Sequence, residues 1–292
     1  MALPGLAPSS IDWRIQAAVG IVATGVAVVL LVRLRERPVV FAVAAALLEV
    51  GLLIAGRGLV RPLVPGGLLT TGGIDWLRSF LVILLPGGAG IAILSWQGWW
   101  ASSGFTPPSQ WRRLRLLWLL GILLILPALS LTQGIHVRGG TLILATVYLI
   151  LATGLEEMFY RGIALRASIS IGVLPSVLIS SLLFGASHVN NLFTSASIAP
   201  AYVLLQAWQA ALVGIFLAGV RLRMNAIWPT IAAHAAYDLF PLVVYWVYAF
   251  RYQVTVAEFW WSTAFGAAFA AIGLFLLRGA KPSIIPMELK MR

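Results

Sequence analysis

Two adjacent glutamates and an arginine interrupt one of the most apolar parts of the sequence. The 14 residues from Thr141 to Gly154 carry no charge, and GLEEMFYRG, which begins at Gly154, then brings Glu156, Glu157 and Arg161. A charged side chain at the middle of a membrane span costs about 2.5–3.5 kcal/mol, so such a group needs a partner, an interface or a function. On one helix Glu157 and Arg161 are four residues apart and can pair, whereas Glu156 points about 100° away and has no partner there.

Two later segments place polar groups at helical spacing. SSLLFGASHVNN has Phe184 and His188 four residues apart, and WPTIAAHAAYDLF has His234 and Asp238 four residues apart. A single histidine in a membrane helix also fits a hydrogen-bonded packing residue. The His234–Asp238 spacing suits a carboxylate that orients an imidazole, or two groups that bind one ion or one substrate atom.

The spacing predicts that these groups lie at similar depths. If the helix of Glu156 turns near residue 170 at ISIG, Glu156 precedes the turn by 14 residues and His188 follows it by 18. At about 1.5 Å per residue they lie roughly 21 Å and 27 Å from the turn, and His234 lies roughly 13 Å from its own preceding loop. We therefore expect one polar site within the membrane, nearer its cytoplasmic side.

Such a site has the groups of a hydrolase. Carboxylates and imidazoles around one cavity supply a general base, a proton shuttle and stabilisers of developing charge. Burial disfavours the charged form of a carboxylate, which suits Glu156 to the role of base. Pairing with Arg161 instead keeps Glu157 ionised, so the two adjacent glutamates are expected to differ in role.

These motifs resemble a known family. EExxxR (Glu156, Glu157, Arg161), FxxxH (Phe184, His188) and HxxxD (His234, Asp238), in this order, are similar to the signature of the CAAX protease and bacteriocin-processing (CPBP) family. These intramembrane endopeptidases are typified by the Ras-converting CAAX prenyl endopeptidase. The resemblance covers about residues 141–250.

The resemblance implies a mechanism. Glu156 would activate water together with His188, His234 and Asp238 would stabilise the oxyanion, and Glu157 with Arg161 would support the site. The last position is often Asn in the family, and Asp238 can donate a hydrogen bond only when protonated; otherwise it would orient His234. The substrate would be a membrane-anchored protein or peptide, cleaved for C-terminal processing, sorting or maturation. A metal-free glutamate mechanism is preferred and no cofactor is expected, although two histidines with carboxylates could ligate zinc.

The composition predicts the elements that position these residues. The chain is 61% hydrophobic and only 10% charged, which is typical of an integral membrane protein. We predict an all-α bundle of eight or nine transmembrane helices, with its catalytic core in the C-terminal half. The predicted spans are about 15–33, 39–56, 79–97, 115–133, 141–166, 173–190, 199–220, 226–250 and 257–277.

The charges predict orientation and exclude some partners. The net charge of +11 is spread over short groups between apolar runs, so it indicates loops on the positive side of a membrane and no nucleic-acid partner. With nine spans, fourteen basic residues against six place the N-terminus outside and the C-terminus in the cytoplasm, in a bacterial inner membrane. The chain has no cysteine, which removes disulfides and a thiolate nucleophile.

Three segments and two competing functions complete the predictions. Residues 1–135 form N-terminal helices without a family motif, 136–255 the protease core, and 256–292 a final helix with a basic tail. A proton or solute transporter would also hold ionisable residues inside a bundle, but it predicts inverted repeats or paired broken helices, which the sequence lacks. An inert immunity or scaffold protein with the same fold is the other alternative. Glu49, alone in ALLEVGLL, is expected to snorkel or to pair with Arg57.

Overall fold

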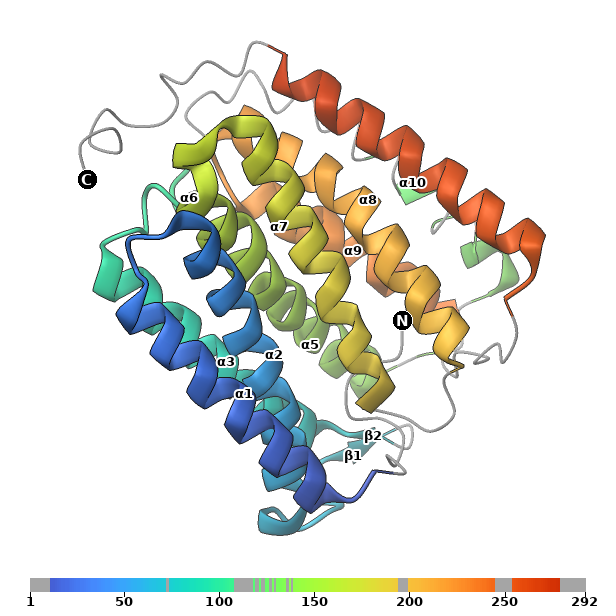
Figure 1. The fold of residues 1–292 in the computed structure, drawn as a ribbon. Helices are drawn as coiled ribbons and strands as arrows, with labels where there is room; N and C mark the ends of the chain where they lie inside the picture. The colour runs from blue at the N-terminus through green and yellow to red at the C-terminus, as the bar shows by residue number, and fades with distance from the viewer. Residues whose placement is uncertain are drawn as a thin grey trace.

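The protein is a bundle of long apolar helices (Figure 1). The computed structural model describes residues 11–71, 74–107, 139–193, 199–244 and 254–278, with scattered positions between 118 and 137. Within these residues seven helical segments are long and apolar enough to cross a membrane. They are Trp13–Arg33, Pro38–Leu63, Trp76–Gln97, Gly139–Ile171, Val173–Phe193, Pro200–Met224 and Val256–Leu277. The protein is thus an all-α, integral membrane helix bundle, as predicted.

The individual elements follow the predicted spans closely. The long helices are α1 (Trp13–Arg33), α2 (Pro38–Leu63), α3 (Trp76–Gln97), α5 (Gly139–Glu157), α7 (Val173–Ser187), α8 (Pro200–Met224), α9 (Trp228–Val244) and α10 (Val256–Leu277). Short elements are the strands β1 (Thr70–Thr71) and β2 (Ile74–Asp75), the helix α6 (Leu165–Ser168), and 3-10 turns at Ser130–Gln133, Ile169–Ile171 and His188–Phe193. The predicted span 115–133 lies largely outside the described residues, so the count of eight or nine stays a prediction.

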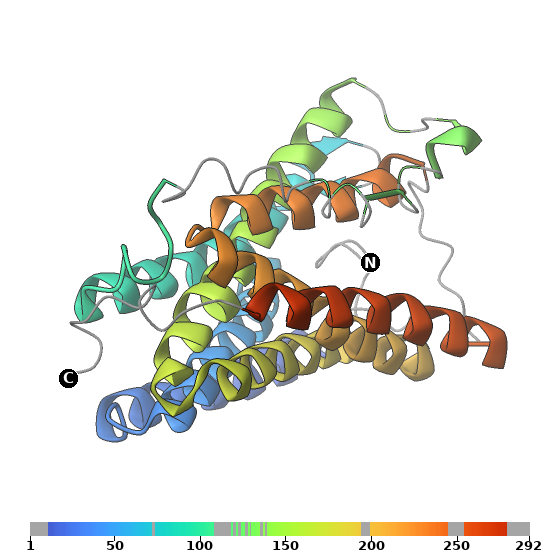
Figure 2. The same ribbon diagram turned by 90° about the horizontal axis from the view of Figure 1, so that it is seen from above.

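Small residues let neighbouring helices approach closely. A Cβ added to Gly20 of α1 would lie 2.2 Å from the backbone nitrogen of Ala55 on α2. On the other side of the bundle, a Cβ added to Gly219 of α8 would lie 2.6 Å from the carbonyl oxygen of Gly273 on α10. Such contacts are how membrane helices associate where lipid offers no hydrophobic driving force. They hold the pairs α1–α2 and α8–α10 on opposite sides of the bundle (Figures 1 and 2).

The two glutamates lie in the middle of the first helical segment of a hairpin, Gly139–Ile171. This segment does not end at GLEEMFYRG. After α5 the chain continues as a π-helical turn, Met158–Ala164, and then through α6. The hairpin turns at Gly172, whose φ of 117° favours glycine, close to the predicted residue 170. Ser180 of α7 donates a hydrogen bond of 2.7 Å to the carbonyl of Tyr160 and so supports the π-helical turn. Turns of this type widen a helix locally and are common at functional sites.

Several arginines assigned to loops from the sequence lie inside helices. Arg57 follows the predicted span 39–56, but α2 continues to Leu63 and so includes it. Arg161 is fully buried, and Arg221 is buried with its guanidinium donating to the carbonyls of Ser102 and Ser103. The composition could not separate them from loop residues, because each follows an apolar run. Without these three arginines, the predicted cytoplasmic loops still carry more basic residues than the loops on the opposite side. The orientation stays a prediction.

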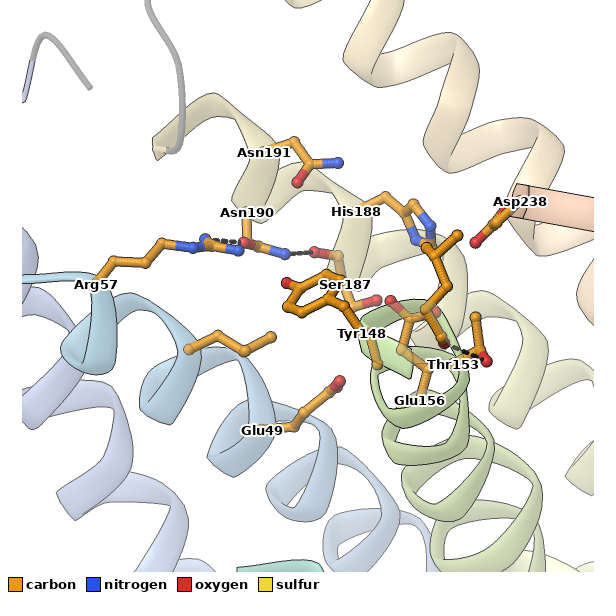
Figure 3. Close-up of a pocket in the computed structure, with 13 residues that line it drawn as sticks. Glu49, Arg57, Tyr148, Thr153, Glu156, Ser187, His188, Asn190, Asn191 and Asp238 are labelled. Atoms are coloured by element: carbon orange, nitrogen blue, oxygen red, sulfur yellow. Dashed lines mark hydrogen bonds between the residues drawn. The ribbon is translucent and has the colours of Figure 1, made fainter. Parts of the chain in front are cut away.

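Helix α2 is the most buried of the candidate spans. It packs against α1 and α3, and also against the π-helical turn, α6 and α7 of the C-terminal half. The division of the chain at residue 135 stays a prediction, but the contacts of α2 cross it. Helices α2, α5, α7 and α9 therefore surround one polar region (Figure 3).

Candidate active site

A cavity of about 50 Å³ lies between the helices of the two halves (Figure 3). Glu156, His188 and Asp238 line it, from α5, the turn after α7, and α9. One water needs roughly 10–15 Å³ measured in this way, so the cavity has room for a few waters. Three of the six predicted site residues thus face one partly open cavity.

Glu156 is the site carboxylate most open to that space. Its side chain is 27% exposed, whereas His188, His234 and Asp238 are each 5% exposed or less. Its Oε2 lies 3.6 Å from Nε2 of His234 and has no hydrogen-bond partner. Glu156 therefore has a buried oxygen without a hydrogen-bond partner beside an imidazole, and its side chain lines a cavity that can hold water.

His234 connects the cavity to a buried ion pair behind it. Its Nδ1 lies 3.0 Å from Oε1 of Glu157, and its Nε2 lies 3.6 Å from Oδ2 of Asp238. The same Oε1 of Glu157 lies 3.1 Å from Nη1 of Arg161, and both of these side chains are fully buried. The Glu157 carboxylate accepts from the ring, so Nδ1 carries the proton and Nε2 faces Glu156 and Asp238.

Phe184 holds the two imidazoles and the guanidinium in place. Its ring meets the rings of His188 and His234 edge-on, with centroids 4.9 Å and 5.5 Å away. The guanidinium carbon of Arg161 lies 4.0 Å from the centroid of the same ring. The FxxxH motif thus supplies His188 to the site and also supplies the Phe184 ring, which contacts groups from three helical segments.

His188 presents its second nitrogen as an acceptor. Its Nδ1 lies 2.9 Å from the carbonyl oxygen of Phe184, one turn earlier. A carbonyl only accepts hydrogen bonds, so Nδ1 carries the proton and Nε2 keeps a lone pair in the neutral ring. His188 lines the same cavity as Glu156, so that lone pair belongs to the same site.

The structure separates the six predicted residues into two sets. Glu156, His188 and Asp238 line the cavity, while Glu157 and Arg161 lie behind it as a buried ion pair. His234 lies between the sets and contacts both. The spacing of four residues predicted three contacts that the structure shows: Phe184 with His188, His234 with Asp238, and Glu157 with Arg161.

Sequence reasoning missed the contribution of α2 to this cavity. The buried Glu49 accepts a hydrogen bond from the hydroxyl of Tyr160 and lines the cavity opposite Glu156. It does not snorkel, and it forms no ion pair with Arg57, whose Nη1 instead donates 2.5 Å to Oδ1 of Asn190. The only signal for Glu49 was its place as a lone carboxylate in an apolar run.

One comparison with known proteins found a family model that matches part of the chain. Residues 138–240 match the family model described as type II CAAX prenyl endopeptidase, Rce1-like. Over these residues the chain is similar to the CAAX endopeptidase family. The match spans α5 to α9 and includes all six predicted site residues. Neither the curated proteins nor the solved structures gave a significant match to the chain.

The CAAX endopeptidase region does not include helix α2, which completes the cavity. Glu49, Leu53 and Arg57 all line it from α2, which lies outside the matched residues. The family match therefore supports a protease site in the C-terminal half, while the cavity itself is built from both halves of the chain.

The described residues of the CAAX endopeptidase region form no preassembled metal site. In the part of the chain that the structure describes, no group of three or more His, Asp or Glu residues is arranged to hold one. Nδ1 of His188 and Nδ1 of His234 each face an oxygen acceptor, the Phe184 carbonyl and the Glu157 carboxylate, so Nε2 is the nitrogen that each ring presents to the site. The chemistry below is accordingly derived from the side chains alone.

Proposed function

We propose that this CAAX-type protein is an intramembrane endopeptidase that hydrolyses a peptide bond with water activated by Glu156. The observation that carries the proposal is that Glu156, whose side chain is 27% exposed, and His188 line the same cavity. The family match over residues 138–240 supports a peptide as the substrate.

The attack needs one base and one acceptor for the water. Glu156 takes a proton from water while the water oxygen forms a bond to the scissile carbonyl carbon. Nε2 of His188 accepts a hydrogen bond from the remaining O–H of that water and so fixes its direction. When the tetrahedral intermediate collapses, the C–N bond breaks and Glu156 returns its proton to the leaving amine. The products are a new carboxyl terminus and a new amino terminus.

The developing oxyanion needs donors on the other side of the cavity. Nε2 of His234, when protonated, and Asp238 face this region, 3.6 Å from one another. Asp238 donates only in its protonated form; as a carboxylate it orients the His234 ring instead. Preorganised donors in a site with little water are worth more than they are in solution, because they need no reorganisation.

Glu157 and Arg161 support the site without touching the substrate. Their buried ion pair holds Nδ1 of His234, and thereby fixes which face of the ring meets Glu156. This arrangement resembles the third member of a catalytic triad, which orients an imidazole and stabilises its charged form.

The cellular setting follows from the same proposal. The substrate is a membrane-anchored protein or peptide that reaches the site within the bilayer. The protein resides in a bacterial inner membrane with its C-terminus in the cytoplasm, and residues 136–255 form the protease core. These assignments rest on the charge bias and on the sequence motifs.

Reconstitution in proteoliposomes tests the class of function. A library of N-terminally lipidated peptides with randomised apolar C-terminal residues is added, and products are read by mass spectrometry. Wild-type protein is expected to yield defined cleavage products, and in water labelled with ¹⁸O the new carboxyl terminus gains one labelled oxygen. A protein that dissipates an imposed proton gradient and cleaves no member of the library would be a transporter, and the proposal would fail.

A further inference from the structure

A buried guanidinium in the cavity has two nitrogens without a hydrogen-bond partner. Arg57 of α2 is 9% exposed and lines the cavity on the side opposite Asp238 (Figure 3). No carboxylate among the described residues forms an ion pair with it, and Glu49 on the same helix accepts from Tyr160 instead. Leaving the N–H groups of a buried charged side chain without acceptors is costly, so these two nitrogens point to a ligand.

The unpaired atoms of Arg57 form one complete binding edge. Its Nη1 donates 2.5 Å to Oδ1 of Asn190, whose own Nδ2 donates 2.6 Å to the carbonyl of Ser187. Its Nε and Nη2 are buried and have no hydrogen-bond partner. These two nitrogens share one edge of the planar group, and two parallel N–H donors on one edge match the two oxygens of a carboxylate.

We propose that Arg57, held by Asn190, is a specificity-determining residue that binds a carboxylate of the substrate. This inference rests on the proposed peptidase function and deepens it. The carboxylate belongs either to the free C-terminus of the substrate or to an acidic side chain near it. Arg57 would thus select where along a peptide the cavity cuts.

The distance along α2 from Glu49 to Arg57 indicates how far the bound carboxylate lies from Glu156. Side chains of a helix point back toward its N-terminus, so the Tyr160 hydroxyl that contacts Glu49 lies near the level of Glu156. Arg57 follows Glu49 by eight residues, which is about 12 Å along α2. An extended peptide spans about 3.3–3.4 Å per residue, so three to four residues would fit, roughly, between the bound carboxylate and the bond beside Glu156.

The prediction is a strong preference for one form of peptide. Hydrogen bonds to charged groups contribute enough that losing them lowers kcat/KM by about tenfold to a hundredfold. A peptide with a free C-terminal carboxylate is therefore expected to be cleaved that much faster than the same peptide with a C-terminal amide. Cleavage should fall about three to four residues before the carboxylate.

The experiment compares three lipidated peptides in proteoliposomes, with products read by mass spectrometry. They are a free acid, its C-terminal amide, and the amide with one Glu at the last position. If the third peptide matches the first, the recognised carboxylate can come from a side chain; if it matches the second, Arg57 reads the C-terminus itself. Both results support a carboxylate ligand.

Variants identify the residue responsible. Arg57→Gln is expected to cleave the free-acid peptide and its amide at the same slow rate. Arg57→Lys should recover part of the preference for the free acid. Arg61→Gln changes an exposed arginine one turn later and should keep that preference in full. Equal cleavage of acid and amide by the wild-type protein would overturn the role of Arg57 and leave the peptidase proposal standing. Absence of any cleavage by the wild-type protein would overturn both.

Discussion

The buried Glu157–Arg161 pair allows stability and activity to be separated. Both side chains are fully buried and their charged atoms lie 3.1 Å apart. In Glu157→Leu the guanidinium keeps its contact with the Phe184 ring at 4.0 Å but loses its counter-charge. Removing one member of a buried pair costs about 3–5 kcal/mol, and we expect a loss near the lower end because the ring still attracts the cation.

The double variant Glu157→Leu with Arg161→Met makes the decisive comparison. Replacing a whole buried pair by apolar residues of similar size is often neutral, so the free energy of unfolding should return to within about 1 kcal/mol of the wild type. Activity should not return, because Nδ1 of His234 has lost its acceptor. We expect kcat to stay lower by about a hundredfold, the lower end of a general acid–base contribution.

Reversible unfolding in mixed micelles of detergent and SDS measures the stability, and peptide cleavage in proteoliposomes measures kcat. Arg61→Gln, an exposed change on α2, controls for the loss of any arginine and should alter neither quantity. A double variant as unstable as the single one would refute the pairing argument. A stable double variant with full activity would refute the positioning role of Glu157.

Three further predictions test the packing and the chemistry. Gly219→Ala should lower the free energy of unfolding by about 1–3 kcal/mol, because its Cβ would lie 2.6 Å from the Gly273 carbonyl oxygen. Gly87→Ala is the control and should cost much less, because the space at its Cβ is open. Equal losses in the two variants would contradict the packing. Ser180→Ala removes the 2.7 Å hydrogen bond to the Tyr160 carbonyl and should cost about 1 kcal/mol in the same unfolding assay, with an unchanged midpoint as the contrary result. Treatment with EDTA or 1,10-phenanthroline should leave peptide cleavage unchanged, and a loss that zinc reverses would overturn the metal-free mechanism.

Local spacing was enough to predict much of the C-terminal half. Residues four apart on a helix share a face, which gave the pairs Phe184 with His188 and His234 with Asp238. The count of residues from a turn near 170 brought Glu156 and His188 to one level, and the structure turns at Gly172. These inferences succeeded because each depends on the geometry of one helix or one hairpin.

The remaining features depend on contacts between distant segments. Glu49 and Tyr160 lie 111 residues apart in the chain, and Arg57 and Asn190 lie 133 apart. No local pattern marks such pairs, so α2 could not be assigned to the site from the sequence. The π-helical turn at Met158–Ala164 was also missed, because no residue pattern marks such a turn and its support comes from Ser180 on another helix.

The most direct test of the account is the turnover of Glu156→Gln in proteoliposomes with a peptide that the wild-type protein cleaves. Gln keeps the size and shape of the side chain but cannot take a proton from water, so kcat should fall by about 10²–10⁴-fold while the unfolding midpoint stays close to that of the wild type. A variant that is equally stable and cleaves at the wild-type rate would show that Glu156 is not the base.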